Sequence, residues 1–268
     1  LASTLATRPY AEYSWEVLTS IAENIEEKSH PLFTEREVKE GKKNILLLLI
    51  TSNRGLCGAY NAQVIKKTLS LFKKEGDSAM IDVITIGRKG DIGMRRLGRN
   101  VIATFAELPD HISLLDVVPI SKMIIDEYSN LNYDKVFVTY TDFISALTQK
   151  PNIKQILPIS KSSLRELIDN LENTQDRQDK KEKVNYLIEG DMNTLTGMLA
   201  EKITRMQIYQ MLLESNASEQ SSRMVAMKNA SEASGEMIDD LTLVFNKARQ
   251  SNITREISEI SAGMASVS

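Results

Sequence analysis

The stretch that decides the fold runs from Met192 to Ser268: MNTLTGMLAEKITRMQIYQMLLESNASEQSSRMVAMKNASEASGEMIDDLTLVFNKARQSNITREISEISAGMASVS. No proline follows Pro158, and Ala, Met, Leu, Glu, Lys and Gln, which all favour helix, predominate in this stretch. Its glycines are Gly197, Gly235 and Gly263. We therefore predict one helix of more than about 60 residues over 192–265, and we assign 192–268 to it as a unit.

A helix of that length needs support that a small domain cannot supply. About 70 residues would extend about 100 Å, whereas a typical globular helix has about 11–12 residues. Apolar and small side chains recur in steps of three and four after a first step of seven, which is the spacing of a heptad seam. The seam residues are Met206, Leu213, Ala217, Gln220, Met224, Met227, Ser231, Ser234, Ile238, Leu241, Phe245 and Ala248. We expect a helical partner or a socket formed by other chains, with an ordinary helical bundle as the alternative.

The beginning of the chain, 1–30, offers the other candidate for a coiled-coil helix. Within Pro9–Lys28, apolar residues recur at i, i+3, i+4 and i+7, which marks one face of a helix. They are Leu18, Ile21, Ala22 and Ile25. This helix is too short to cover the C-terminal one, so either the long helix is largely bare or the chain lacks its beginning. Because residue 1 is Leu1 and not methionine, we favour the second interpretation.

The middle of the chain, 44–171, alternates apolar strand patterns with helix patterns. This alternation predicts an α/β domain with a mainly parallel, Rossmann-like sheet. The expected strands are Asn44–Ser52, Met80–Ile86, Val101–Phe105 and Lys135–Thr141, with a further extended piece at Gln155–Pro158. The expected helices are Asn61–Lys74, Asp91–Arg96 and one within Ile112–Tyr128. The polar run Asn173–Lys183 indicates a linker, and we assign 172–191 to a linker and foot segment.

Composition excludes several classes of protein. The 268 residues include 33 Lys and Arg against 36 Asp and Glu, a net charge of −3, so we expect no nucleic-acid partner. One cysteine, Cys57, excludes a disulfide framework and a Cys-based zinc site, and two histidines, His30 and His111, exclude a His-rich metal cluster. The longest uninterrupted apolar run is Ile45–Ile50, far short of the roughly 20 residues that span a bilayer. With no signal peptide visible, we expect a soluble intracellular protein without a membrane anchor of its own.

Glycine-rich turns are the first candidates for chemistry. Gly55–Gly58 follows the first strand, where α/β sheets bind phosphates, but it matches neither GxGxxG nor a Walker A loop. We interpret it as a tight turn beneath a neighbouring element, and we interpret the glycines after the second strand (Gly87, Gly90 and Gly93) as another turn. Cys57 has no histidine near it in sequence, which favours a structural thiol over a nucleophile. An enzyme built on the α/β domain therefore has no specific support, and we predict no catalytic residue, metal or cofactor.

A dense polar set lies near the end of the long helix, just before an apolar tip. Its members are Asn246, Lys247, Arg249, Gln250, Asn252, Thr254 and Arg255. The set is either a solvated helix face or a contact set for a partner chain. Arg and Gln make directed hydrogen bonds to carboxylates and carbonyls, which suits a latch. A free-standing coiled-coil scaffold is the competing hypothesis, since it would use the same helix to form a homodimer.

Three stretches together resemble the gamma subunit of rotary, F-type ATP synthases. They are Thr51–Asn61 (TSNRGLCGAYN), Ser218–Ala230 (SEQSSRMVAMKNA) and Leu241–Ile260, which contains NKARQ at 246–250. The matches occur in the family's order along almost the whole chain. The resemblance implies a central rotor shaft, in which the N- and C-terminal helices form a long antiparallel coiled coil inside a hexamer of alpha and beta subunits. Catalysis would then belong to the beta subunits, and this chain would not be catalytic itself.

The resemblance also implies partners and a location. Outside the hexamer, the α/β domain would meet an epsilon/delta-type stalk subunit and the ring of membrane-embedded c subunits. The shaft would couple ion-driven rotation of that ring, by protons or sodium, to the catalytic cycle. It would lie at the inner face of an energy-transducing membrane, most simply the bacterial inner membrane, with the mitochondrial inner membrane as the alternative.

The resemblance assigns roles to five residues. Arg249, Gln250 and Thr254 match positions that resemble a catch on a beta-subunit loop. Tyr186 and Glu189 match a foot segment that resembles Tyr-x-x-Glu-Pro and contacts the c-ring. The chain departs from the family in four places. The family's basic, amphipathic segment that precedes the equivalent of Leu1 is absent, Asn53 replaces a common Asp or Glu, Gly190 replaces the proline of the foot, and the two-cysteine insertion of the chloroplast type is missing.

Overall fold

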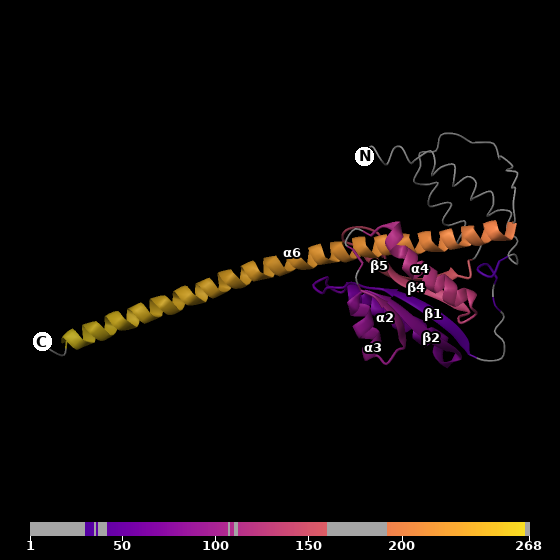
Figure 1. Ribbon diagram of the computed structural model, residues 1–268. Coiled ribbons are helices and arrows are strands. Elements are labelled where there is room, and N and C mark those ends of the chain that lie inside the picture. Colours follow the sequence, from indigo (N-terminus) through magenta and orange to yellow (C-terminus); the bar gives the residue numbers. More distant parts are fainter. Residues whose placement is uncertain are drawn as a thin grey trace, which may run out of the picture.

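In a computed structural model, the described residues are 30–34, 36, 42–106, 108–109, 112–159 and 192–265. They form an α/β domain from which one helix projects far beyond the sheet (Figure 1). The strands are β1 (Lys43–Ile50), β2 (Ala79–Ile86), β3 (Val101–Phe105), β4 (Lys135–Phe143) and β5 (Gln149–Leu157). The helices are α2 (Tyr60–Glu75), α3 (Arg88–Arg96), α4 (Leu114–Ser129) and α6 (Met192–Ala265), with a short 3₁₀ turn η1 (Gly76–Ser78) after α2.

The five strands form a mixed sheet in the order β3-β2-β1-β4-β5. β1 pairs in parallel with both neighbours, so that Leu47 lies opposite Val83 of β2 and Phe137 of β4. β5 is antiparallel to β4 because only residues 144–148 join them, and a connection that short cannot return a strand in the parallel sense. The predicted mainly parallel α/β sheet is confirmed, although β5 begins six residues before the expected extended piece at Gln155.

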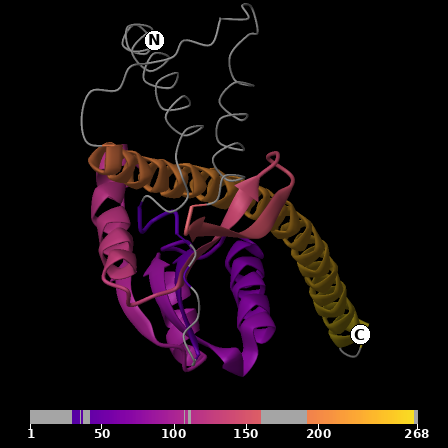
Figure 2. The same cartoon turned by 90° about the vertical axis from the view of Figure 1, so that its right-hand side faces the viewer.

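Two helical layers cover the sheet (Figures 1 and 2). On one face, α2 and α3 bury Leu47 and Leu49 of β1 against Val64 and Met94. On the other face, α4 and the first part of α6 bury Leu46 and Leu48 in the larger core, which also contains Ile120, Ile124 and Ile208. Since both faces are covered, β1 is buried from Ile45 to Ile50, as expected for a central parallel strand.

The long helix is one unbroken element. α6 has 74 residues, or about 110 Å at 1.5 Å per residue, and it continues through Gly235 without a break. The prediction of a single helix of more than about 60 residues is therefore confirmed. Buried side chains are confined to its first half, up to Ser218, whereas from Met227 onward every described side chain except half-buried Asn246 is exposed.

The face that α6 presents to the sheet is not the predicted seam. Its buried row follows steps of four and three and consists of Thr204, Ile208, Met211, Ser215 and Ser218. The predicted seam lies two residues out of phase, about 200° around the helix, and is exposed: Leu213 to 40% and Met224 to 60%. The α/β domain thus uses one side of α6 and leaves the predicted seam on the opposite side.

Several predicted elements lie outside the described residues. These are the helix within Pro9–Lys28, most of 1–30, the segment 172–191 and the end of the 44–171 domain. The antiparallel coiled coil therefore remains a prediction. Over the part of the chain that the structure describes, no helix is long and apolar enough to cross a membrane.

Candidate functional site

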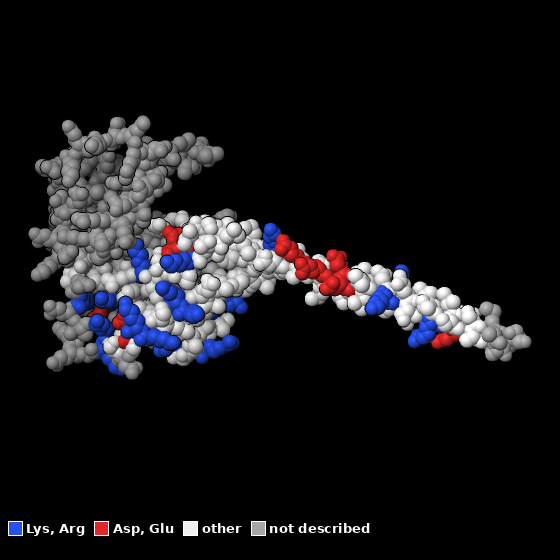
Figure 3. Space-filling model, turned by 180° about the vertical axis from the view of Figure 1, so that it is seen from behind, with Lys and Arg blue, Asp and Glu red and all other residues white. Residues whose placement is uncertain are grey.

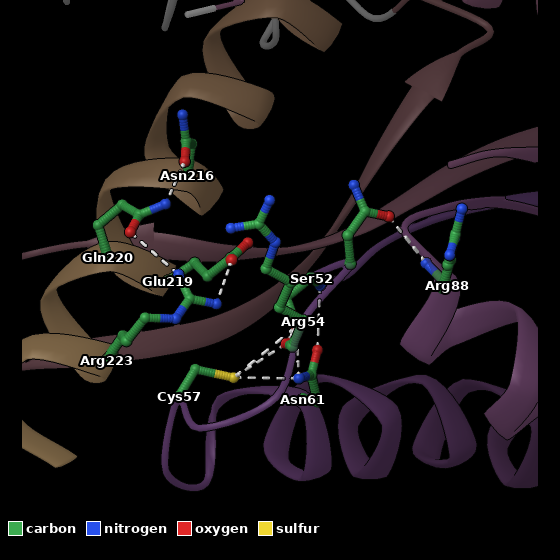
Figure 4. Close-up of polar contacts among 10 residues, drawn as sticks. Ser52, Arg54, Cys57, Asn61, Arg88, Asn216, Glu219, Gln220 and Arg223 are labelled. Carbon is green, nitrogen blue, oxygen red and sulfur yellow. Dashed lines mark hydrogen bonds and ion pairs between the residues drawn. The ribbon is translucent and has the colours of Figure 1, made fainter. Parts of the chain in front are cut away.

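A cleft lies where α6 passes the carboxyl ends of β1 and β2. Its volume is about 970 Å³. The loop after β1 contributes Arg54 and the start of α3 contributes Arg88 to one wall, and α6 contributes Glu219 and Arg223 to the other. Open α/β sheets bind ligands at the carboxyl ends of their strands, so this cleft is a candidate binding site. In this chain, a helix of the same chain borders those strand ends (Figure 4).

The loop after β1 is folded tightly beneath α6. Leu56 and Gly58 both have positive φ, 63° and 57°, and a Cβ added to Gly58 would lie 3.8 Å from Cβ of Ala226 on α6. This confirms the interpretation of Gly55–Gly58 as a tight turn under a neighbouring element. Polar groups of the loop and of the start of α2 hold its shape: Ser52 Oγ donates to the Arg54 carbonyl oxygen at 2.6 Å, and Asn61 Nδ2 donates to Ser52 Oγ.

Cys57 belongs to that hydrogen-bonded loop. Its side chain is 2% exposed, and Asn61 Nδ2 lies 3.1 Å from its Sγ (Figure 4). The same amide also donates to Ser52 Oγ at 2.7 Å, while Asn61 Oδ1 accepts from the Ser52 backbone N–H at 3.1 Å. The expected burial of the thiol is confirmed, and its structural role stays a prediction.

The second group of glycines is only partly a turn. Gly87 precedes α3 with φ of 91°, and a Cβ there would come within 2.2 Å of the Thr51 carbonyl oxygen. Gly90 and Gly93, however, lie inside α3, so the prediction of a turn is wrong for them. Their lack of side chains lets α3 lie close to its neighbours: the Gly90 N–H donates to Thr51 Oγ1 at 2.8 Å. A close-packed helix, not a turn, explains this spacing.

The α6 wall of the cleft carries a chain of side-chain bonds (Figure 4). Arg223 and Glu219 form an ion pair at 2.7 Å, and Arg223 Nη1 donates to Gln220 Oε1 at 3.0 Å. On the loop wall, Asn53 Oδ1 accepts from the Arg88 N–H at 3.1 Å, so the asparagine fixes the start of α3. Among the described residues, neither Arg54 nor Arg88 forms an ion pair. No group of three or more His, Cys, Asp or Glu side chains in the described chain could hold a metal ion.

A pair of carboxyl groups lies at the junction of α6 with β4. Glu214 of α6 hydrogen-bonds to Asp142 of β4, and the pKa of Glu214 is raised, chiefly by burial and also by the charge of Asp142. Asn152 Nδ2 donates to Asp142 at 2.9 Å, and Gln210 Nε2 donates to Glu214 at 3.1 Å. Burial also raises the pKa of Tyr140, which bonds to Asp142. The junction therefore favours the protonated form of Glu214.

The polar set near the end of α6 stands apart from this cleft. Arg249, Gln250 and Thr254 are all exposed, and Thr254 Oγ1 donates to the Gln250 carbonyl oxygen at 2.9 Å within the helix. Gln250 and Thr254, four residues apart, share a face, and Arg249 lies one position away. The helix thus presents these side chains together, but any site that they form must be completed by another chain. Tyr186 and Glu189 lie outside the described residues.

The sequence analysis did not identify the ion pair on the α6 wall of the cleft or the serines that bond α6 to β4 and β5. The Glu219–Arg223 spacing of four residues within Ser218–Ala230 was an available signal, because such pairs face each other on a helix. The serines that face β4 are polar and do not contribute to an apolar periodicity, so no sequence pattern predicted their burial.

Comparisons with known proteins agree along the whole chain. The family model described as "ATP synthase" matches residues 2–267. The ATP synthase gamma chain of Legionella pneumophila (strain Corby) is 34% identical over 263 residues, which cover 98% of this chain and 86% of the relative. That of Coxiella burnetii (strain Dugway 5J108-111) is 36% identical, over 97% of this chain and 86% of the relative.

The chain belongs to the ATP synthase gamma chain family.

Solved structures share the gamma-chain fold. The central stalk and c-ring structure of the Tetrahymena thermophila mitochondrial ATP synthase contains a chain with a TM-score of 0.55 and 24% identity, covering 85% of this chain and 99% of that one. A chain in the rotor of the Euglena gracilis mitochondrial enzyme gives a TM-score of 0.54 and 17% identity, covering 94% and 92%. The relatives are gamma chains, and the titles of the two structures place their chains in a central stalk with its c-ring and in a rotor. The resemblance seen in the sequence is confirmed.

Proposed function

We propose that this gamma chain works as a torque-carrying shaft. The exposed distal part of α6 from Met227 onward, here called the bare half, would turn inside a hexamer of alpha and beta subunits. The observation that supports this most directly is the distal half of α6, a single helix that projects beyond the domain with its side chains exposed (Figure 1). Several large apolar side chains on it are more than 60% exposed. They include Ile238, Leu241, Leu243, Val244 and Phe245.

Exposed apolar side chains on one helix favour a surrounding partner. Burying a side chain such as Leu241 or Phe245 is worth about 1.5–3 kcal/mol, so a sleeve that covers several of them would gain much free energy. We infer that the helix within Pro9–Lys28 covers part of α6 as an antiparallel coiled coil. The hexamer would then enclose the tip, where Ile253, Ile257 and Ile260 are exposed.

The polar set before the tip suits a reversible catch. Arg249, Gln250 and Thr254 would bond to a loop of a beta subunit in some rotor positions and release it in others. A few charge-assisted hydrogen bonds near water break more readily than a large apolar interface. Because Thr254 Oγ1 already bonds to the Gln250 carbonyl, the catch would depend mainly on Arg249 and the Gln250 amide.

The other end of the chain would face the membrane-embedded part of the complex. We propose that Tyr186 and Glu189 contact the c-ring, and that the α/β domain binds an epsilon/delta-type stalk subunit. The chain would then lie at the inner face of an energy-transducing membrane, a bacterial inner membrane by analogy with the bacterial relatives, and be held there by the complex.

The test is assembly with and without the bare half. The full chain and a version that ends at Met227 are each combined with alpha and beta subunits, and ATP-driven rotation of a bead on the α/β domain is recorded. We expect sustained rotation only with the full chain. Equal rotation with the shortened chain, or no association of the full chain with the hexamer, would contradict the proposal.

A further inference from the structure

Three serines follow the face of α6 that lies against β4. Ser215, Ser218 and Ser222 are spaced by three and four residues, which places them in one row. Ser215 is 1% exposed, Ser218 is fully buried and Ser222 is half-buried. The row continues the line of Ile208 and Met211. The seat of α6, by which we mean the face of the helix that contacts the domain, therefore changes from apolar to polar as the helix leaves the domain.

The first two serines bond to the backbone of a single β4 residue. The Thr141 N–H donates to Ser215 Oγ at 3.1 Å, and Ser218 Oγ donates to the Thr141 carbonyl oxygen at 3.3 Å. β1 pairs with β4 only from Lys135 to Thr139, so Thr141 lies beyond the end of that ladder. Its register partner in β5 is Pro151, which has no N–H to donate to the Thr141 carbonyl oxygen. Both peptide groups of Thr141 therefore bond to side chains of the helix.

The third serine bonds to the tip of the β4–β5 hairpin. Ser222 Oγ lies 3.1 Å from Gln149 Oε1, and the Gln149 amide donates to the carbonyl oxygens of Ser145 and Ala146 at 3.1 and 2.8 Å. Residues 143–148 are all exposed, so no buried apolar contact holds this tip on the helix. Gln149 thus closes the turn and joins it to α6, and Figure 2 shows the hairpin lying against the helix.

We propose that this serine row sets the register of the shaft helix on the domain, and that Ser215, Ser218 and Ser222 are positioning residues for torque transfer. Apolar contacts such as those of Ile208 and Met211 are non-directional, so they hold a helix in place without fixing its rotation about its own axis. Hydrogen bonds to fixed backbone atoms are directional and specify that rotation. This inference rests on the proposed function, because register matters only if the helix transmits torque.

The test compares two pairs of serine substitutions on the same helix. The variant is Ser215→Ala with Ser218→Ala, and the control is Ser231→Ala with Ser234→Ala, whose serines are exposed. Both pairs change helix propensity equally. Spin labels on Leu147→Cys and Lys228→Cys, both exposed, report the distance between hairpin and helix in the assembled complex, while buried Cys57 stays unlabelled. Proton or sodium-ion transport per ATP hydrolysed is measured in vesicles.

We expect the variant to assemble, because the apolar part of the seat is intact. Its label-to-label distances should broaden, and ion transport per ATP should fall at least about twofold, since each lost hydrogen bond is worth about a fivefold change in population. The control should match the wild type in both measurements. Unchanged distances and transport in the variant would overturn the inference, whereas a wild-type complex that transports neither protons nor sodium ions would instead overturn the proposed function.

A second pair of variants changes Ser222, which is half-buried, so that its substitution is less disruptive to folding than changes at Ser215 and Ser218. Ser222→Ala should reproduce the broadened distances in smaller degree, and Ser222→Thr, which keeps the hydroxyl, should restore the wild-type distribution. If the double variant fails to assemble, this pair decides. Equal behaviour of the Ala and Thr variants would then count against the serine row.

Discussion

The two halves of α6 differ in what surrounds them and not in what makes them helical. Up to Ser222, the helix lies on the sheet and hides a row of side chains that changes from apolar to serine. Beyond Met227, the same helix continues with Ile238, Leu241 and Phe245 more than 60% exposed. An acidic band made by Glu232, Glu236, Asp239 and Asp240 lies just past the domain (Figure 3). Helix propensity therefore sets the length of α6. Packing determines which part of the helix is buried against the described domain.

The largest expected effect comes from truncating one isoleucine in each half. Ile208→Ala, at a fully buried position, should lower the free energy of unfolding of the full chain by about 2–5 kcal/mol, because it leaves a cavity in the core. Ile238→Ala, at a position 63% exposed, should change it by less than about 0.5 kcal/mol. Denaturant unfolding of both variants measures the difference. Equal losses would show that the bare half is packed within the chain itself.

The next effect concerns the bare half alone. Arg249→Ala should remove a charge-assisted hydrogen bond worth about 1.5–3 kcal/mol and slow multisite ATP hydrolysis in the reconstituted complex. Nucleotide affinity at the first, tightest site should hardly change, because the proposed catch bonds to a beta-subunit loop and not to the nucleotide. Lys247→Ala is the matched control, as another exposed cation on the same turn. Equal damage to single-site binding and multisite turnover would place the effect at the catalytic site.

A smaller, pH-dependent effect belongs to the seated half. The raised pKa of Glu214 means that the fold favours its protonated form, so this stabilisation is complete below the ordinary value of 4.5 and is lost as pH rises through the folded value. Glu214→Gln keeps a neutral side chain at every pH. The variant should therefore have a higher melting temperature than the wild type at pH 8, and the difference between the two melting temperatures should shrink toward pH 4.

Thermal unfolding across that pH range checks this prediction. Glu236→Gln, on the exposed acidic band, is the control and should show no such pH-dependent difference. A Glu214→Gln variant that melts below the wild type at pH 8 would mean that the ionised carboxylate stabilises the junction.

The smallest effect is expected in the loop beneath α6. Cys57→Ser should leave ATP hydrolysis by the assembled complex within about twofold, or roughly 0.4 kcal/mol of barrier. The thiol is buried among loop side chains, and serine keeps a hydrogen-bonding atom for Asn61. Steady-state hydrolysis of intact complexes measures it. Complete loss of activity in an assembled complex would give Cys57 a role beyond packing.

Most of the fold could be predicted because its signals are local. The apolar run Ile45–Ile50 indicated a doubly covered strand, and the proline-free stretch from Met192 indicated the long helix. The side of α6 that meets the sheet could not be predicted, since serines complete the buried row and their role appears only once Thr141 is seen beyond the end of β1. β5 was found only over its end, because Lys150, Pro151 and Asn152 hide its strand pattern.

The candidate site divides in the same way. The turn at Gly55–Gly58 and the burial of Cys57 followed from motif spacing, whereas the carboxyl pair of Asp142 and Glu214 joins residues far apart in sequence and left no local trace. The proposed catch and foot rest on family resemblance, and partner chains would have to complete them.

The overhang of α6 has a mechanical consequence. Within the described residues, the helix extends about 58 Å from Met227 to Ala265 past its last contact with the α/β domain, so the domain holds it as a beam clamped at one end. At that length, each degree of tilt at the clamp displaces the free end by about 1 Å. A change of tilt too small to break any contact in the domain would therefore shift the tip by a sizeable part of a hydrogen-bond length. The stiffness of the rotor is then determined as much at the base of the helix as along its shaft.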